Sequence, residues 1–484
     1  MATFSIENFG CRATDADAAA LRQELMAGGF SIARDHSNAD FVVLNTCTVT
    51  ASADSQTRDA VRKIHRAHPR AQIVLTGCYA QRAPGELAAL EGVALVVGNS
   101  HQTGIPGFLS ELPCSPGGTS LHGGSSDFIP LARLERIPPE RTAAKILQGD
   151  ALAQSPWPTT RTRVVVHDRT RPIVKVQDGC NNRCAYCVIP FVRGRSRSLP
   201  PDHVVAEVHA LAAAGTKEAV LSGINLGSYG RDLTPRTGLE DLVRRVLCET
   251  EIQQLRFSSI EPRDVTEDLV ALVGSSRDRI AAHFHVPIQS GSDRVLRGMR
   301  RWYRAEQCAQ RIKLIRRYLP HAGIGADILV GFPGETDEEF LATAEFVNRL
   351  PFTYLHVFSF SARPGTEAAK MGGAVPSEVI RARARQLRAL AAAKASAFRT
   401  SQTGRTLRGL TLARGGEGWT GALTGNYLKV RIAGQFPPNE WHDVRITPDS
   451  AETASLGSPQ EVSVESVFEN DFGEREIPAV RDAQ

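Results

Sequence analysis

The chain has 484 residues, of which 42% are hydrophobic and 23% are charged, and its formal net charge at pH 7 is +5. This length exceeds one ordinary domain and predicts two to four domains. The composition is that of a globular protein, and no stretch approaches the roughly 20 consecutive apolar residues that cross a bilayer, so we exclude a membrane protein.

The amino-terminal residues lack the basic segment followed by an apolar segment that marks a chain for export. Nine cysteines, an odd number, are spread over the sequence, which argues against a disulfide framework and for reduced thiols. Both observations predict a cytoplasmic protein. The modest positive charge permits a polyanionic partner without demonstrating one.

The first third of the chain alternates strand-like and helical segments. Apolar runs at 41–44 and 73–75 flank a helical segment at about 53–68, which predicts βα units and a parallel sheet. A cysteine follows each of three strand candidates: Cys11, Cys47 and Cys78. Ligands of open parallel sheets lie beyond the carboxyl ends of the strands, so we expect a three-cysteine site at one sheet edge. Buried structural cysteines are the alternative.

From about 112 to 163 the periodicity stops and breaker residues accumulate, which predicts a linker or insertion. Six strand-like runs then alternate with helical runs, at 173–177, 219–222, 255–258, 282–286, 325–330 and 354–360. Six βα units predict a partial barrel, and such barrels place their sites on the loops after the strands. A long helix from 376 to about 399 closes this segment.

The first barrel strand leads directly into the most informative motif of the chain. Cys180, Cys184 and Cys187 form a C-x3-C-x2-C run. Three thiolates on one loop can hold three corners of an iron–sulfur cubane and leave the fourth iron open to another ligand. A zinc site is the alternative, although zinc usually takes four ligands arranged in two pairs.

The segment from about 404 to 467 shows short alternating runs broken by glycine and proline, which predicts a small β-barrel. Basic residues are interleaved there with Trp419, Tyr427 and Trp441. Cations for phosphates and aromatic rings for bases suit RNA. A β-domain with ordinary solvated arginines is the alternative.

Together these features resemble the radical S-adenosylmethionine (SAM) methylthiotransferase family, over nearly the whole chain except residues 112–163. The motifs that carry the resemblance are Asn45-Thr46-Cys47-Thr48-Val49-Thr50, Thr76-Gly77-Cys78-Tyr79-Ala80-Gln81, Gln177-Asp178-Gly179-Cys180-Asn181-Asn182 and Ser222-Gly223-Ile224-Asn225. The triplet after Cys47 is most similar to the branch that acts on threonylcarbamoyladenosine in tRNA. Branches acting on isopentenyladenosine or on a ribosomal-protein aspartate are alternatives. After Cys11 the chain departs from the family pattern, with Arg12-Ala13-Thr14 where Lys-Val-Asn is usual.

The resemblance implies an α/β architecture of successive domains. A parallel βα methylthiotransferase domain at 1–111 is followed by the linker or insertion at 112–165. A partial (β/α)6 radical SAM barrel then occupies 166–400. A small TRAM-like β-barrel that binds RNA follows at 401–468, and a tail at 469–484.

The resemblance also implies two [4Fe–4S] clusters and SAM as cofactors. Cys180, Cys184 and Cys187 would hold the catalytic cluster that cleaves SAM, and Cys11, Cys47 and Cys78 the second. The reaction would add a methylthio group to C2 of N6-threonylcarbamoyladenosine at position 37 of tRNA, next to the anticodon. Partners would be tRNA and an electron donor such as flavodoxin or ferredoxin. A non-catalytic iron–sulfur electron carrier or an RNA-binding module is the alternative outside the family.

Further candidate residues surround these motifs. We expect SAM contacts from Tyr186, Ser222, Gly223, Asn225, Ser259, Glu261, Gln289, Gly325, Ile328 and Gly331. We expect RNA contacts from Arg193, Arg195, Arg197, Arg405, Arg408, Lys429 and Arg431. Ordinary turn or core chemistry is the alternative for the first set, and a solvated basic loop for the first three arginines.

Overall fold

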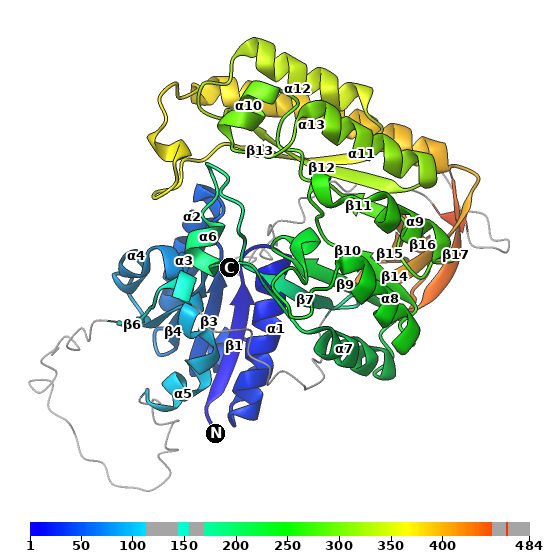
Figure 1. Ribbon diagram of the computed structural model, residues 1–484. Coiled ribbons are helices and arrows are strands. Elements are labelled where there is room, and N and C mark those ends of the chain that lie inside the picture. Colours follow the sequence, from blue (N-terminus) through cyan, green and yellow to red (C-terminus); the bar gives the residue numbers. More distant parts are fainter. Residues whose placement is uncertain (113–143, 154–168, 448–460, 463–484) are drawn as a thin grey trace, which may run out of the picture. The chain divides into compact units, whose positions relative to one another are not determined.

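The computed structural model describes residues 1–112, 144–153, 169–447 and 461–462. They form two compact units, one made of Met1–Gln154 together with Phe191–Arg193 and the other of Ser155–Pro190 together with Gly194–Gln484 (Figure 1). Across the described ranges, no helix combines the length and the apolar character that a membrane crossing requires.

The first unit contains a parallel six-stranded sheet in the order β2-β1-β3-β4-β5-β6. Its strands are β1 (Thr3–Asn8), β2 (Ser31–Ile32), β3 (Phe41–Thr46), β4 (Gln72–Gly77), β5 (Val93–Gly98) and β6 (Lys145–Leu147). The predicted parallel sheet is therefore confirmed. The three strands that precede cysteines, β1, β3 and β4, are direct neighbours, so their carboxyl ends meet at one edge.

Helices cover both faces of this sheet, as Figure 1 shows. Because successive strand residues point to opposite faces, Phe41 and Val43 pack with α1 (Arg12–Ala27) and α5 (Ile105–Ser110). Val42 and Leu44 pack on the other face with α2 (Ala51–Ala67), α3 (Cys78–Arg82) and α4 (Pro84–Ala88). Burial on both faces explains why β3 reads as a continuous apolar run.

Part of the predicted linker is a strand of this sheet. Residues 145–147 form β6, which pairs in parallel with β5. Two side chains hold the residues just after this strand, since Gln148 Nε2 donates to the Gln81 carbonyl at 2.8 Å and Gln81 Nε2 donates to the Gly149 carbonyl at 2.9 Å. A strand of three residues leaves too short a pattern to detect in the sequence. Cys114 and most of the predicted linker lie outside the described residues.

The second unit contains the six predicted barrel strands. They are β7 (Ile173–Asp178), β9 (Glu218–Gly223), β10 (Gln254–Phe257), β11 (His283–His285), β12 (Gly323–Val330) and β13 (Tyr354–Ser359). The short β8 (Arg197–Ser198) pairs antiparallel with β7, which the sequence did not predict. The sheets β10-β9-β7-β8 and β11-β12-β13 are joined by parallel bridges Leu255↔Ile280 and Ser259↔His285. The result is a partial barrel.

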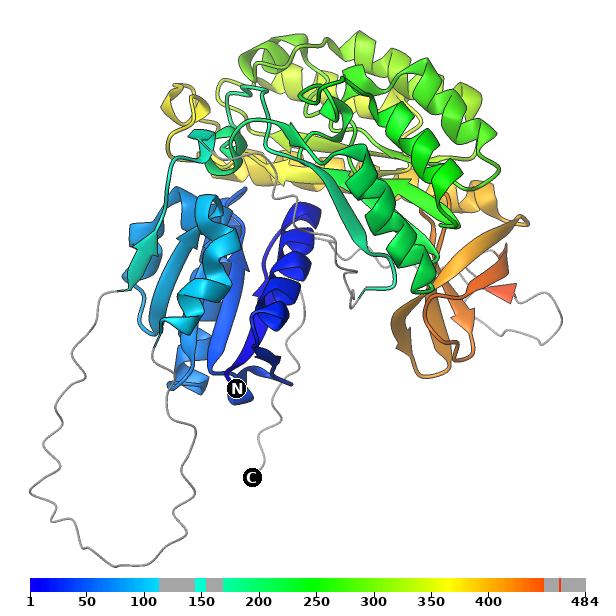
Figure 2. The ribbon, with the colours of Figure 1, turned by 60° about the horizontal axis from the view of Figure 1, so that its bottom comes forward.

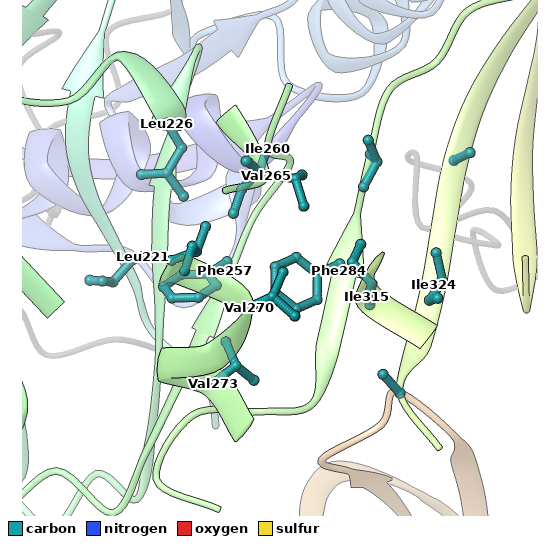
Figure 3. Packing of buried hydrophobic residues seen from close by; sticks show 14 of the residues in the cluster. Leu221, Leu226, Phe257, Ile260, Val265, Val270, Val273, Phe284, Ile315 and Ile324 are labelled. Atoms are coloured by element: carbon teal, nitrogen blue, oxygen red, sulfur yellow. The ribbon is translucent and has the colours of Figure 1, made fainter. Parts of the chain in front are cut away.

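A hydrophobic core lies between the barrel strands and the helices around them (Figures 2 and 3). Leu221, Phe257, Phe284 and Ile324 point outward from their strands into this core, where Ile315 meets them. The covering helices are α7 (Pro201–Ala213), α8 (Leu239–Glu249), α9 (Glu267–Ser275), α10 (Asp293–Gly298), α11 (Ala305–Tyr318), α12 (Asp337–Arg349) and α13 (Ser377–Gln402). Because successive side chains of a strand point to opposite faces, the remaining side chains of each strand face the lumen of the barrel. The lumen is polar.

The chain ends in a curled antiparallel sheet in the order β16-β15-β14-β17-β18. Its strands are β14 (Thr406–Gly416), β15 (Trp419–Thr424), β16 (Lys429–Ala433), β17 (Trp441–Ile446) and β18 (Glu461–Val462). A register shift between Thr411 and Gly415 bends β14. The edge strands β16 and β18 approach one another, so the sheet curls back on itself as the predicted small barrel requires.

A fully buried arginine attaches this module to the barrel. Arg256 of β10 pairs with Glu218 of β9 at 2.7 Å and also donates to the carbonyls of Thr424 and Gly425 at 3.1 Å each. Beside it, the Tyr427 ring stacks on His283 with 4.2 Å between centroids. Glu218 and His283 are the first residues of their strands, so the module packs at the amino ends of the barrel strands.

We predict that Gly325→Ala destabilises the protein. A Cβ at Gly325 would lie 2.0 Å from Cζ of Tyr354, and overpacking of this kind costs about 1–3 kcal/mol. Urea unfolding followed by fluorescence measures the change. The matched control is Gly372→Ala, where a Cβ meets no atom within 4 Å among the described residues. Equal stability of the two variants would contradict the assigned packing.

Candidate iron–sulfur sites

Three cysteines of the first unit gather beyond the carboxyl ends of adjacent strands. Cys47 directly follows β3, Cys78 directly follows β4, and Cys11 is the residue that precedes α1 after β1. Cys47 and Cys78 are only 5% and 2% exposed. A Cβ on Gly10 would lie 3.2 Å from the Cys47 sulfur, so a side chain at that position would crowd the site.

Burial and the neighbouring charged groups shift the pKa values of two of these thiols. Burial raises the pKa of Cys47 well above its ordinary value, and repulsion from Cys11 and Cys78 raises it further. Burial also raises the pKa of Cys78, against the attraction of Arg193. A cationic group bound in place of the thiol protons would offset the cost of burying the thiolates and the repulsion between them. Two buried thiols and the half-buried Cys11 at one sheet edge fit an iron–sulfur cluster.

The residues that follow Cys47 have structural roles. The Thr48 hydroxyl donates to Asp54 Oδ1 at 2.7 Å and accepts from Arg82 Nε at 2.7 Å. Thr50 caps the start of α2 by accepting from the Ala53 amide. This triplet therefore fixes the loop that carries Cys47.

The second cysteine set lies on the loop after β7, in the second unit. Cys187 N donates to the Cys184 carbonyl at 3.1 Å, and Cys180 N donates to the Gly194 carbonyl at 3.1 Å. Glycine is required at Gly179, because its φ is +70° and a Cβ would lie 2.1 Å from the Arg195 carbonyl oxygen. Burial and the neighbouring thiols raise the pKa of Cys187 to about 12, so this set also fits a cluster that displaces protons.

An ion pair lies next to this set. Arg301 Nη1 contacts both carboxylate oxygens of Glu261, at 2.8 and 2.9 Å, and its guanidinium carbon lies 6.0 Å from the Tyr186 ring centroid. Arg301 also lowers the pKa of Cys184, although burial raises it more. Glu261, one of the predicted SAM contacts, is engaged with Arg301 here. The sequence analysis missed Arg301 because nothing in its local pattern marks it.

Asn225 is the strongest of the predicted SAM contacts. Its backbone N–H donates to Gln177 Oε1 at 2.7 Å, and its Nδ2 lies 4.0 Å from Cys180 Sγ. The residue is 6% exposed, and its Oδ1 has no hydrogen-bond partner among the described residues. A buried acceptor without a donor fits a ligand that brings one, such as the ammonium of SAM. Ser222 and Gly223 are the last two residues of β9, and Asn225 follows this strand by two residues.

The cavity beside this loop has a volume of about 270 Å³. Every residue that lines it has a polar or charged side chain: Asn181, Asn182, Ser196, Asn225, Ser228, Arg231, Asp232 and Arg263. Arg231 pairs with Asp264, while Arg263 Nε is 3.6 Å from the same carboxylate. The cavity therefore offers hydrogen-bonding groups to a ligand.

Three of the predicted SAM contacts have packing explanations instead. Ile328 is fully buried in the outer core, on the face of β12 away from the lumen. Gly325 makes room for Tyr354, and Gly331 makes room for Ile380 of α13. The expectation for Ile328 is thus wrong, because a side chain in that core cannot reach a ligand in the lumen.

Gln289 and Ser259 lie at the ends of lumen strands. Gln289 has a φ of +73°, which is uncommon for a residue with a side chain, and it pairs with β12 through the bridge to Ile328. Ser259 is bridged to His285. Both positions are compatible with ligand contact from the lumen.

The lumen also contains a hydrogen-bonded network that the sequence analysis missed. His285 Nε2 and His356 Nδ1 lie 2.8 and 3.2 Å from Asp327 Oδ1, and the Tyr354 hydroxyl lies 2.8 Å from His283 Nε2. Burial would raise the pKa of Asp327, but the two histidines lower it well below its ordinary value. The network spans three strands, so its members are far apart in the sequence.

The arginines proposed for RNA occupy different environments. Arg195 is exposed, whereas Arg197 contacts Asp178 at 3.4 Å. Arg193 is only 2% exposed and is paired with Asp17, so the expectation of a phosphate contact is wrong for this residue. In the terminal module, Arg405 contacts His321, and Lys429 is exposed.

Two other module arginines stack on tryptophan. The guanidinium carbon of Arg408 lies 4.3 Å from the Trp441 ring centroid, and that of Arg431 lies 4.4 Å from the Trp419 ring centroid. Such stacked pairs keep an aromatic face and a positive charge together.

Two family models match the chain. Residues 3–98 match the uncharacterized protein family UPF0004, and residues 174–347 match the radical SAM superfamily. The threonylcarbamoyladenosine tRNA methylthiotransferase MtaB of Aquifex aeolicus is 34% identical over 89% of this chain and 96% of its own length. The MtaB of Bacillus subtilis is 35% identical over 81% of this chain and 80% of its own length. The chain belongs to the radical SAM methylthiotransferase family. It is therefore an enzyme, and the alternative of a non-catalytic carrier is excluded.

This membership brings the predicted cofactors, [4Fe–4S] clusters and SAM. A second kind of methylthiotransferase is nearly as similar: the tRNA-2-methylthio-N(6)-dimethylallyladenosine synthase of Syntrophobacter fumaroxidans is 33% identical over 88% of each chain. Among solved structures, the radical SAM methyltransferase TsrM of Kitasatospora setae aligns with a TM-score of 0.54 at 18% identity, over 76% of this chain and 77% of its own. At that identity the likeness supports the fold alone.

We predict that metal binding to Cys180, Cys184 and Cys187 tightens as pH rises. Burial raises the pKa of each thiol, so each is protonated at neutral pH and binding must release protons. In a variant with Cys11, Cys47 and Cys78 replaced by alanine, the Co²⁺ affinity should increase more than about tenfold per pH unit between pH 6 and 8. Absorption of the sulfur-to-cobalt band measures it. An affinity independent of pH would contradict the prediction, and a further Cys184→Ala change is the control.

Proposed function

We propose that this enzyme adds a methylthio group to C2 of N6-threonylcarbamoyladenosine at position 37 of tRNA, using two [4Fe–4S] clusters. The observation that carries the proposal is the presence of two separate sets of three cysteines. One cluster requires three ligands of its own, so two sets support two clusters with different tasks.

The chain's own residues supply binding and orientation. Gln177 holds Asn225 just after β9. The Asn225 Oδ1, which no described residue contacts by a hydrogen bond, can receive a ligand N–H. Arg301 and Glu261 hold opposite charges next to Cys184. When bound, the Cys180 cluster and SAM supply one-electron chemistry that activates a C–H bond.

The polar cavity supports the threonylcarbamoyl substrate over the dimethylallyl one. A threonylcarbamoyl group carries a carboxylate, a hydroxyl and urea N–H groups, whereas a dimethylallyl group is a hydrocarbon. Arg263 and Asn181 line the cavity and suit the first group, because a charged hydrogen bond contributes about 1.5–3 kcal/mol.

Stacked Arg408–Trp441 and Arg431–Trp419 pairs support RNA binding by the terminal module. The module lies at the amino ends of the barrel strands, while the cluster loop follows a carboxyl end. The eight residues of β12 span about 26 Å at about 3.3 Å per residue. An RNA bound at both places must therefore extend along the barrel, which a folded tRNA is large enough to do.

Deletion of the gene should remove the methylthio mark from threonylcarbamoyladenosine and leave the unmethylthiolated nucleoside in its place. Mass spectrometry of digested tRNA measures both nucleosides, and re-expression of the chain should restore the mark. Loss of the methylthio mark from dimethylallyladenosine instead would establish the alternative substrate. A change in neither nucleoside would contradict a tRNA substrate.

Arg263→Leu should lower kcat/KM for tRNA carrying threonylcarbamoyladenosine by about 10- to 100-fold, because a charged hydrogen bond to the substrate carboxylate is lost. SAM cleavage without tRNA should be unchanged. Arg236→Leu, at an exposed arginine of the same unit, is the control. Equal activity of the two variants would place the substrate elsewhere.

A further inference from the structure

Arg193 brings a positive charge into the buried surroundings of Cys78. Its Nε donates to Cys78 Sγ at 3.2 Å, and its Nη2 donates to Asp17 Oδ2 at 2.8 Å. Arg193 and Asp17 are both only 2% exposed. Asp17 belongs to α1, the helix that Cys11 precedes. The guanidinium thus connects Cys78 to α1, the helix that begins directly after Cys11.

Stability alone is a weak reason for this arrangement. A buried ion pair carries a desolvation cost for each charge, and well-packed apolar residues often serve stability as well or better. The Arg193 guanidinium is also directed at a sulfur atom. Hydrogen bonds to the sulfur ligands of an iron–sulfur cluster are one of the factors that set its reduction potential.

Asn99 fixes the same group of atoms from another side. Its Nδ2 lies 3.7 Å from Cys78 Sγ and donates to the Val192 carbonyl at 2.8 Å. The residue before Arg193 is therefore held by a side chain that also approaches the sulfur. This second contact reduces the freedom of Arg193 to move away from Cys78.

The residue after Arg193 is Gly194, which forms a hydrogen bond with a cysteine of the second set. The Gly194 carbonyl accepts from Cys180 N at 3.1 Å, and Gly194 has a φ of +76°, a backbone conformation that favours glycine.

We infer that Arg193 is a positioning residue that sets the reduction potential of the cluster on Cys11, Cys47 and Cys78, with Asp17 as its counter-charge. This inference rests on the two-cluster part of the proposed function. Reduction adds negative charge to the cluster. The Arg193 N–H and its positive charge favour that reduced state, and the Asp17 carboxylate opposes it.

The test uses the full-length chain with Cys180, Cys184 and Cys187 replaced by alanine, so that only the other cluster is present. Redox titration followed by electron paramagnetic resonance gives the ratio of reduced to oxidised cluster. Arg193→Gln should lower this ratio about tenfold at a fixed potential, a shift of about 59 mV for a one-electron couple. Asp17→Asn should raise the ratio, because the guanidinium then lacks its counter-charge. Arg195→Gln, at the exposed arginine two residues later, should leave it unchanged.

Opposite shifts in the two variants separate tuning from a merely structural role, which would not change sign. Potentials that are unchanged, or that move in the same direction while iron is retained, would overturn the inference. If the Arg193→Gln variant does not retain iron, the Asp17→Asn variant alone tests the inference, and its reduction potential should rise. Iron loss in both variants would also overturn it, since the pair would then be structural. Absence of iron from the parent triple variant would instead refute the two-cluster proposal.

Discussion

Burial disfavours the ionised form of a thiol, and nearby thiolates disfavour it further, and this constraint acts in both cysteine sets. In the first unit, Cys47 and Cys78 are almost completely buried, and burial raises the pKa of both. In the second unit, burial and neighbouring thiols raise the pKa of Cys187 to about 12. The irons of a bound cluster take the place of the thiol protons and neutralise the sulfur ligands.

The fold forms these two cysteine sets in different ways. Adjacent parallel strands β1, β3 and β4 deliver one cysteine each to a shared edge, which requires long-range assembly of the sheet. The loop after β7 instead carries all three ligands within eight residues, and Gly179 and Gly194 shape it. Around the second set the barrel lumen is polar, because alternate residues of β9 to β13 turn away from the hydrophobic core.

The sequence was sufficient wherever the signal was local. The strand-then-cysteine placement and the C-x3-C-x2-C spacing were readable because neighbouring residues carry them, and the six barrel strands appeared where apolar runs predicted them. The Ile328 prediction failed for a simple geometric reason. In a strand, residues three apart point to opposite faces, so Ile328 cannot share the lumen with Gly325. Arg193 was misread because its partners Asp17 and Cys78 are 176 and 115 residues away, and only the folded chain brings them together.

The most direct measurement is the iron content of the anaerobically reconstituted enzyme, combined with Mössbauer spectroscopy. The account predicts about eight irons per chain, as two [4Fe–4S] clusters. Replacement of Cys47 and Cys78 by alanine should reduce the content to about four and leave SAM cleavage intact. About four irons in the unaltered chain, with no loss when Cys47 and Cys78 are replaced, would contradict it.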